Sequence, residues 1–220
     1  MKINIAIDGP SAAGKSSISD MLAQRLGYTH LDTGAMYRAV ALNAIRKGIA
    51  LDDEEKIVDM ISNMKLQMLP DGRVILEDED VSEEIRTNEI SMGASDVSKL
   101  QGCREALVKM QQNICKEGGY ILDGRDIGTV VLKDAPVKIY MVASAEARAQ
   151  RRVLQNQNQG LEADYEQILE DIKKRDYQDM HRDHSPLMKA EDAIEIDTSD
   201  MTKDEVCDAV MKIVLEKTGD

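Results

Sequence analysis

A glycine-rich segment near the N-terminus has the residue types and the spacing of a phosphate-binding loop. Gly9-Pro-Ser-Ala-Ala-Gly14-Lys15-Ser16 matches the pattern G-x-x-x-x-G-K-[ST] at every fixed position. Glycine lets the backbone wrap closely around phosphate groups with its N–H groups pointing inward, and a helix that begins at the loop adds its positive end. Lys15 is predicted to reach the β- and γ-phosphates, and Ser16 to offer its hydroxyl to Mg²⁺. The residues predicted to bind the nucleotide are Gly9, Pro10, Ser11, Ala12, Ala13, Gly14, Lys15, Ser16 and Ser17.

The context of this loop favours phosphate binding over a chance match. Roughly one per cent of unrelated chains of this length would contain the pattern, but here it lies between an apolar strand pattern and an amphipathic helix pattern. The loop alone does not define the reaction, because GTPases and regulatory ATPases share it. The guanine-reading sequence N-K-x-D does not occur in the chain, which argues against a GTPase.

A second candidate segment places an acidic residue at the end of an apolar strand. The strand pattern Y-I-L is followed by Asp123, Gly124, Arg125 and Asp126. Asp123 has the position of a Walker-B acid, which would hold the water shell of Mg²⁺. Arg125 and Asp126 could form a structural ion pair, but at the ligand-binding edge of such a sheet a functional role is favoured.

A third segment, L-D-T-G-A-M-Y-R at residues 31–38, opens a predicted helix directly after a strand position. A lone arginine is usually a solvated surface charge. Arg38, however, would face the edge of the sheet where ligands bind in α/β folds. Tyr37 is predicted to pack in the core and not to contact a ligand.

Arginines are also dense in a later segment of this acidic chain. Arg175, Asp179 and Arg182 are spaced i, i+4 and i+7 and would share one face of a helix. Taken alone, they could be an exposed salt-bridge stripe. Three more arginines come shortly before this helix: Arg148, Arg151 and Arg152. Guanidinium groups clamp phosphates bidentately and neutralise charge on a transferring phosphoryl group, so the cluster predicts a phosphoryl-transfer site.

These segments favour a phosphate group as the acceptor. A hydroxyl acceptor usually needs a catalytic base, whereas a phosphate monoester is mostly ionised near neutrality because its second pKa is about 6. The motifs supply arginines and no obvious histidine or glutamate base. Transfer to a phosphate needs in-line positioning and charge neutralisation only.

The elements that must position these residues alternate between strands and helices. Strand patterns are found at residues 3–7, 120–122, 137–142 and 193–196, and a fifth strand is expected just before the 31–38 segment. Helix patterns follow the glycine-rich loop, the 31–38 segment and two of the later strands. This alternation predicts an α/β fold with a central five-stranded parallel sheet flanked by helices.

Two stretches break the alternation. Residues 57–98 predict a short helix and then an antiparallel hairpin, whose strands at 66–69 and 73–76 are joined by the turn sequence P-D-G. Residues 152–163 contain the polar, glycine-ended run Q-N-Q-N-Q-G at 155–160, which predicts an irregular, mobile lid between two helices. We expect one domain, 1–220, with its core at 1–56 and 99–220.

Composition excludes several other classes. With 28 basic and 41 acidic residues the formal net charge is −13, which would repel a nucleic acid polymer or an anionic membrane. The chain has no Trp and no Phe for stacking bases. Its three cysteines form no CxxC pair, and no signal peptide or membrane-spanning pattern is found. We therefore expect a cytoplasmic protein.

Taken together, the segments resemble the bacterial cytidylate (CMP) kinases, and the resemblance extends over essentially the whole chain. It is carried by IAIDGPSAAGKS, LDTGAMYR, EDVSEEIRT, REAL, LDGRDIGTVV, DAPVKIY and the RR before the lid. The resemblance implies a P-loop kinase fold and the ATP- and Mg²⁺-dependent phosphorylation of CMP and dCMP in pyrimidine nucleotide metabolism. It also implies that residues 57–98 form an NMP-binding insertion, and we expect a monomer.

The resemblance implies roles for individual residues as well. Ser95, Arg104 and Asp126 would read the cytosine, with Thr33 nearby. Arg175 and Asp179 would hold the ribose, and Arg38, Arg125 and Arg182 the acceptor phosphate. Lys15, Ser16 and Ser17 would bind ATP–Mg²⁺, with Arg151 or Arg152 in the lid region. The residues expected to act in transfer itself are Lys15, Arg125, Arg151, Arg152 and Arg182.

Two alternatives remain open from the sequence. One is a P-loop kinase for another small acceptor, such as shikimate, dephospho-coenzyme A or a different nucleotide. The other is a regulatory protein that binds ATP without transferring its phosphate. The hairpin insertion and DGRDIGTVV argue against the first, and the second would need a partner surface that no apolar stripe suggests.

Overall fold

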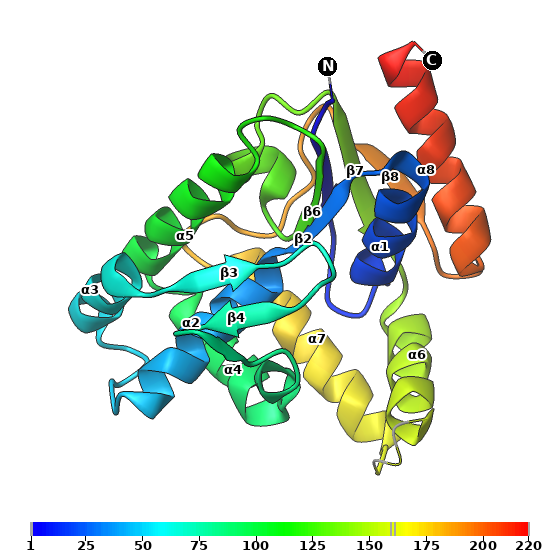
Figure 1. The fold of residues 1–220 in the computed structure, drawn as a ribbon. Helices are drawn as coiled ribbons and strands as arrows, with labels where there is room; N and C mark the ends of the chain where they lie inside the picture. The colour runs from blue at the N-terminus through cyan, green and yellow to red at the C-terminus, as the bar shows by residue number, and fades with distance from the viewer. Residues whose placement is uncertain (1, 159, 161, 220) are drawn as a thin grey trace.

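A five-stranded parallel sheet lies at the centre of the computed structural model, which describes residues 2–158, 160 and 162–219 (Figure 1). Its strand order is β2-β6-β1-β7-β8, which confirms the predicted sheet. The strands are β1 (Ile5–Asp8), β2 (Thr29–Asp32), β6 (Tyr120–Gly124), β7 (Val137–Val142) and β8 (Ile194–Asp197). Asp8 pairs with Gly124, and Asp32 with Asp123, so the polar strand ends meet at one edge.

Helices cover both faces of this sheet because its strands are apolar on both sides. Ile5 and Ile7 of β1 pack against α1 (Lys15–Leu26) and α8 (Lys203–Thr218), which lie side by side in Figure 1. Ala6, between them, belongs to the cluster on the opposite face, with α2 (Thr33–Arg46) and α5 (Gln101–Ile114). Side chains alternate along a strand, so one short strand contributes to two cores.

The region between α2 and α5 contains the predicted short helix and hairpin and three further short elements. Helix α3 (Glu54–Asn63) leads into β3 (Leu66–Met68) and β4 (Val74–Leu76), which pair antiparallel across the P-D-G turn as predicted. A short third strand, β5 (Glu79–Asp80), extends this sheet, and a 3₁₀ turn η1 (Glu84–Arg86) and helix α4 (Asn88–Val97) follow. The sequence analysis predicted neither β5 nor α4.

Tertiary packing stabilises α4 more than its composition does. Its sequence N-E-I-S-M-G-A-S-D-V contains Asn, Ser and Gly, which are poor helix formers. Gly93 nevertheless allows a close approach to α2, because a Cβ atom there would lie 3.2 Å from Cβ of Ala41. Thr87 caps the helix by accepting a hydrogen bond from the N–H of Ile90.

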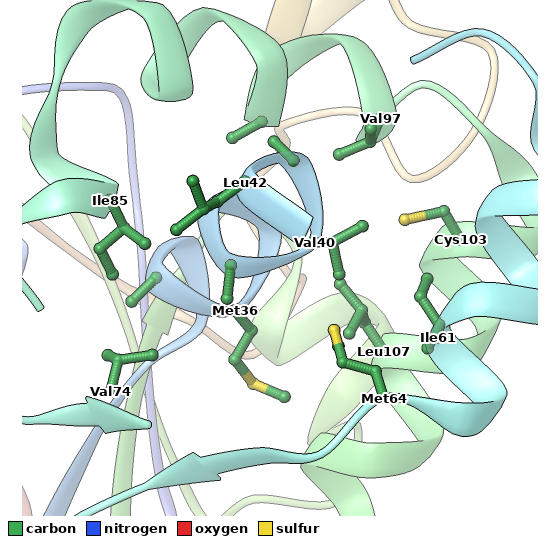
Figure 2. Packing of buried hydrophobic residues seen from close by; sticks show 14 of the residues in the cluster. Met36, Val40, Leu42, Ile61, Met64, Val74, Ile85, Val97, Cys103 and Leu107 are labelled. Atoms are coloured by element: carbon green, nitrogen blue, oxygen red, sulfur yellow. The ribbon is translucent and has the colours of Figure 1, made fainter. Parts of the chain in front are cut away.

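The inserted elements share one hydrophobic cluster with α2. Figure 2 shows Met36 and Val40 of α2 surrounded by Val74 of β4, Ile85 of η1 and Val97 of α4, and all five are buried in the same cluster. The insertion is therefore fixed on the helix that begins at the ligand edge of the sheet. Its position relative to that edge follows from core packing.

The lid prediction was wrong about local structure. Helix α6 (Ala145–Asn158) continues through residues 155–158, part of the run 155–160 that was expected to be irregular, and packs against α7 (Tyr165–His181) (Figure 1). Glutamine is a fair helix former, and packing on a neighbouring helix extends α6 through the polar run. Gly160 lies in a turn with φ +70°, while residues 159 and 161 are outside the described residues.

Among the described residues, none of the helices combines the length and the apolar character needed to cross a membrane.

The glycine that opens the phosphate-binding loop is required by close packing. Gly9 has φ +149°, and a Cβ atom there would lie 2.1 Å from the carbonyl oxygen of Met141 in β7. No side chain fits without moving the end of β1 away from β7. The loop therefore leaves the sheet along a path that only glycine allows.

We predict that Gly9→Ala lowers the free energy of unfolding by about 3 kcal/mol or more, because a strand end must shift. Gly72→Ala is the matched control. Gly72 also has a positive φ, +84°, but a Cβ atom there would meet nothing within 4 Å. It should cost about 1–2 kcal/mol. Urea unfolding of both variants measures the difference, and equal losses would contradict the packing argument.

Candidate functional site

A cleft of about 860 Å³ lies at the carboxyl edge of the central sheet, between the glycine-rich loop, α2, α4 and α7. It brings together most of the residues predicted from the sequence. Those that line it are Ser11, Ala12, Gly14, Lys15, Ser16, Ser17, Thr33, Arg38, Ser95, Arg104, Asp123, Arg125, Asp126, Arg152, Arg175, Asp179 and Arg182. They come from segments up to 171 residues apart (Ser11 to Arg182), so the fold assembles one site from distant motifs.

Four of the predicted residues do not line the cleft. Gly9, Pro10 and Ala13 are buried outside the cleft, and the carbonyls of Gly9 and Pro10 each accept a hydrogen bond of 2.8 Å from Nζ of Lys15. Arg151 turns away from the cleft and donates to the backbone carbonyls of Ala13 and Thr198. Its predicted role in transfer gains no support from this placement.

The glycine-rich loop presents positive charge to the cleft. Gly14, with φ +94°, is the N-cap of α1 and provides no side-chain cap, so N–H groups of the first helical turn are left for another acceptor. Lys15 is buried in the same place. Burial first, and then repulsion from Arg125, lower the pKa of Lys15 to about 7. An anionic group bound here would stabilise the charged form of this lysine.

Asp123, at the end of β6, is held by two side chains. Its carboxylate accepts a hydrogen bond of 2.8 Å from Ser16 and lies 2.6 Å from Nε2 of His30. Burial opposes ionisation of Asp123, but the hydrogen bond and positive charge of His30, the charge of Lys15 and the bond from Ser16 outweigh it and keep the pKa of this carboxyl below its usual value. The predicted pair of metal-binding oxygens, Ser16 and Asp123, is thus in direct contact.

His30 is a site residue that the sequence analysis missed. Its second ring nitrogen, Nδ1, lies 2.6 Å from the carboxylate of Asp20 on α1, so the ring bridges two acids. Burial alone would lower the pKa of His30, but the hydrogen bonds to Asp123 and Asp20 raise it to about 10. The available signal was its place in β2, two residues before Asp32 and therefore on the same side of the strand.

Three of the arginines in the cleft are each paired with one aspartate. Arg104 donates to Asp126, and Arg125 donates from Nε to Asp179 at 2.8 Å. The third pair joins Arg38 to Asp32, whose other oxygen caps α2 by accepting from the N–H of Ala35. Each aspartate accepts hydrogen bonds from some of the N–H groups of a guanidinium and fixes the plane of that group. The remaining N–H groups therefore keep a defined direction.

Two further guanidinium groups in the cleft, those of Arg175 and Arg182, have no carboxylate within hydrogen-bond distance among the described residues; Arg182 lies 3.9 Å from Asp126. Burial, and then repulsion from Arg125, lower the pKa of Arg175 to about 10. Burial and repulsion from Arg104 likewise lower the pKa of Arg182. Within the described residues, Nε of Arg175 and one terminal nitrogen of Arg182 are buried without a hydrogen-bond partner. Unpaired buried donors are costly, so these groups are suited to bind an anion.

The segment after β6 is fixed by a second residue that the sequence analysis missed. Asp8, the last residue of β1, accepts hydrogen bonds of 2.8 and 2.7 Å from the N–H groups of Ile127 and Gly128. These residues begin a single π-helical turn, η2 (Ile127–Val131). Burial raises the pKa of Asp8 to about 6, although both backbone bonds favour its ionised form. Asp8 thereby fixes the chain directly after Arg125 and Asp126.

One end of the cleft has a planar side chain beside the Arg104–Asp126 pair. Tyr37, which the sequence predicted to be a core residue only, packs on the core and also lines the cleft. The guanidinium of Arg104 lies 5.6 Å from the centroid of its ring. The hydroxyl of Thr33 donates to the carbonyl of Asp123 at 2.7 Å, and Ser95 also lines the cleft. This end can contact a flat, hydrogen-bonding ligand.

Comparison with protein families and relatives shows the family to which the chain is similar. Residues 5–216 match the family model described as cytidylate kinase. A cytidylate kinase of Caldicellulosiruptor bescii is 53% identical over 215 residues, which are 96% of this chain and 95% of the relative. A cytidylate kinase of Bacillus velezensis is 44% identical, and the match covers 99% of this chain and 98% of the relative.

Solved structures are similar in fold at low sequence identity. A gluconokinase from Sinorhizobium meliloti aligns with a TM-score of 0.51 and 13% identity, covering 99% of this chain and 97% of its own. An uncharacterized protein from Eubacterium ventriosum aligns with a TM-score of 0.52 and 13% identity, covering 97% and 98%. These likenesses support the P-loop kinase fold and carry no information on the substrate.

The His30 bridge predicts a pH dependence of stability. The folded-state pKa, about 10, lies above the ordinary value of 6.5. The stabilisation is therefore complete below pH 6.5 and is lost as the pH rises towards 10. Between these pH values, urea unfolding should show a loss of about 2 kcal/mol more in the native protein than in His30→Gln. Lys15 titrates in both proteins, so the difference isolates His30.

His181→Gln is the control, because the ring of His181 is exposed and bonds to the backbone carbonyl of Tyr177. This variant should follow the native pH profile. The bridge would be contradicted if His30→Gln followed that profile as well.

Proposed function

The chain belongs to the cytidylate kinase family and catalyses the ATP-dependent phosphorylation of CMP, and from this premise we propose how the cleft carries out the transfer. The observation that supports the proposal is the set of buried, incompletely paired cations at the carboxyl edge of the sheet. Lys15, Arg175 and Arg182 all have lowered pKa values there. A site of this kind is stabilised by phosphate groups, which supply the missing negative charge.

ATP is proposed to bind with its phosphates in the glycine-rich loop. The uncapped N-terminus of α1 and the ammonium group of Lys15 face that position. Nζ of Lys15 is held by two loop carbonyls, 2.8 Å from each. It can exchange these partners for phosphate oxygens with little movement of the backbone. Ser17 and Arg152, which also line the cleft, would complete the donor side.

Mg²⁺ fits the residues present beside this loop. The hydroxyl of Ser16 and the carboxylate of Asp123 are oxygen donors in contact with each other, and hard cations prefer oxygen ligands. We propose that these two residues hold Mg²⁺, directly or through its water shell. When bound, the ion neutralises charge on the transferring phosphate.

The acceptor is proposed to occupy the arginine-rich half of the cleft. Arg38, Arg125 and Arg182 would bind the phosphate of CMP, because their guanidinium groups are oriented by separate partners and line one cleft. Arg175 and Asp179 would contact the ribose. The phosphate would then lie between these arginines and the loop that holds the γ-phosphate.

The cytosine is proposed to lie against the Arg104–Asp126 pair. A carboxylate can accept from the 4-amino group of cytosine, and a guanidinium can donate to its ring nitrogen or carbonyl oxygen. Asp126 also lies 3.9 Å from a terminal nitrogen of Arg182, so base recognition and phosphate binding share one carboxylate. Ser95 and Thr33 are close enough to line the same pocket. Uracil presents a carbonyl in place of the amino group and should be disfavoured.

The chemistry needs no general base from the protein. The phosphate of CMP is mostly ionised near neutrality, since its second pKa is about 6. One of its oxygens attacks the γ-phosphorus of ATP in line, the bond to the β–γ bridging oxygen breaks, and ADP and CDP result. The arginines neutralise charge on the transferring group and align the two phosphates.

We extend the proposal to dCMP, which shares the base and phosphate of CMP. Phosphorylation of these two nucleotides would give the protein a role in pyrimidine nucleotide metabolism. We also propose that it is cytoplasmic and monomeric. Arg175 and Asp179, which line the cleft and are proposed to contact the ribose, would determine how far the two acceptors differ.

We predict that release of ADP from Mg-ATP depends on CMP or dCMP. The measurement compares CMP, dCMP, UMP, AMP, GMP, shikimate and no acceptor in a coupled assay. Turnover with CMP and dCMP should exceed that with UMP and the purine nucleotides by about 10-fold or more. ADP release at the same rate without an acceptor, or strongest with another acceptor, would contradict the proposal.

Asp126→Asn should lower kcat/KM for CMP by about 10- to 100-fold, because a charged hydrogen bond to the base and the partner of Arg104 are lost together. The ratio of CMP to UMP turnover should fall as well, since an amide can donate to the uracil carbonyl. The Kd of ATP, measured by calorimetry, should change less than about threefold. Asp59→Asn, exposed on α3 away from the cleft, is the control. Equal losses for CMP turnover and ATP binding would contradict the base-reading role.

A further inference from the structure

One buried arginine outside the cleft connects three parts of the chain. Arg148 of α6 is 4% exposed, and its Nε donates to the carbonyl of Ala143 at the end of β7, at 2.9 Å. Its Nη1 donates to the carbonyl of Ser11 in the glycine-rich loop at 3.1 Å. Both terminal nitrogens also bind the carboxylate of Asp176 on α7, at 3.0 and 2.5 Å. A single guanidinium therefore joins the sheet, the loop and α7.

The contact with Asp176 fixes the helix that carries acceptor residues. Asp176 follows Arg175 directly and precedes Asp179 by three residues, so all three lie within about one helical turn. Asp179 is bound to Arg125 at the end of β6, at 2.8 Å. Helix α7 is thus fastened at two points of the same turn, to β6 through Asp179 and to the loop through Asp176. Arg175 lies next to Asp176, at one end of this turn.

The contact with Ser11 fixes the loop itself. A trans peptide places its C=O and N–H groups on opposite sides. With the Ser11 carbonyl bound to Arg148, the N–H of Ala12 is directed away from Arg148. The next residue, Ala12, has φ +59°, an uncommon conformation for alanine that needs support from its surroundings. Arg148 provides that support through its hydrogen bond to the carbonyl of Ser11.

We propose that the Arg148–Asp176 pair is a positioning device, which sets the distance and orientation of the acceptor residues on α7 relative to the phosphate-binding loop. The proposal rests on the proposed function, since it concerns how CMP and ATP are aligned in that cleft. Arg148 and Asp176 touch neither reacting group in this account. They act through Ser11 on the donor side and through Arg175 and Asp179 on the acceptor side.

The geometry requires arginine at this position. The planar guanidinium has donors on several sides, and four of its bonds are made at once to Ala143, Ser11 and both oxygens of Asp176. The ammonium of lysine is a compact donor that cannot reach all three partners together. Lysine should therefore keep the charge and lose part of the alignment.

The same two helices provide a matched control. Glu146 of α6 and Lys173 of α7 form an ion pair at 3.4 Å whose side chains are more than half exposed. This pair joins α6 to α7 but makes no hydrogen bond to the loop among the described residues. Breaking it tests whether any link between α6 and α7 would serve.

The experiment measures kcat, KM and separate binding of CMP and ATP for Asp176→Asn, Arg148→Lys and Arg148→Met. We expect Asp176→Asn and Arg148→Met to lower kcat by about 10- to 100-fold, because misalignment of reactants by about 1 Å costs this much. Arg148→Lys should lie between Arg148→Met and the native protein. The Kd of CMP alone and of ATP alone, by calorimetry, should change less than about threefold. The double variant Arg148→Met/Asp176→Asn should lose no more than the worse single variant.

Glu146→Gln and Lys173→Met should keep kcat within about twofold of the native value. Binding stoichiometry in the same calorimetry gives the folded fraction, so a variant that merely folds poorly is corrected for it. Asp176→Asn and Arg148→Lys are conservative enough to decide the matter if Arg148→Met does not fold.

Native kcat in Asp176→Asn and Arg148→Lys would overturn the proposal, as would losses in the double variant that simply multiply. A kcat loss matched by an equal loss in Glu146→Gln would overturn it too, because any helix contact would then suffice. These outcomes leave CMP phosphorylation by the native protein intact. Absence of CMP-dependent ADP release in the native protein would instead overturn the proposed function and this inference with it.

Discussion

The structure depends on holding several arginines close together inside an acidic protein. Guanidinium groups repel one another, and burial removes the water that would screen them. Aspartates beside these arginines reduce the repulsion: Asp126 pairs with Arg104, Asp179 with Arg125, and Asp32 with Arg38. Buried ion pairs of this kind add little net stability, because desolvation opposes the attraction. Their effect is to orient the donors, so that a phosphate meets arginines that are already in place.

The parallel sheet makes this arrangement possible. Asp8, Asp32 and Asp123 end three neighbouring strands, and the parallel register brings these ends to one edge. Each acid then organises a different neighbour. Asp8 fixes η2, Asp32 caps α2 and binds Arg38, and Asp123 binds Ser16 and His30. The strand ends therefore provide the acids of the site, and most of its arginines come from helices and from the segment after β6. Ligand sites in open α/β sheets generally lie at this edge.

The main elements of the fold could be predicted from the sequence, because short-range patterns determine them. The glycine-rich loop, the five strands and the hairpin with its P-D-G turn were all found, since each has a local signature.

Helix α4 was not predicted, because its stability comes from packing Gly93 against α2 and not from propensity. Residues 155–158 were expected to be irregular and are helical for a similar reason, the contact with α7. The role of His30 depends on Asp20 and Asp123, which are 10 and 93 residues away, and no local pattern contains such information. Arg151 was predicted to be a site residue because other arginines lie close to it in the sequence. In the structure it does not line the cleft and donates to the backbone carbonyl of Ala13 in the loop.

The central claim is that donor and acceptor sites face each other across one cleft, close enough for direct transfer. Calorimetric titration with a nucleotide in which cytidine and adenosine are joined at their 5′ positions by a chain of five phosphates tests it most directly. Because the linker lets both halves bind at once, the account predicts one molecule bound per chain, with a Kd at least about 100-fold below that of ATP or CMP alone. A Kd no lower than that of ATP would mean that the two halves cannot bind together, and would contradict the single cleft.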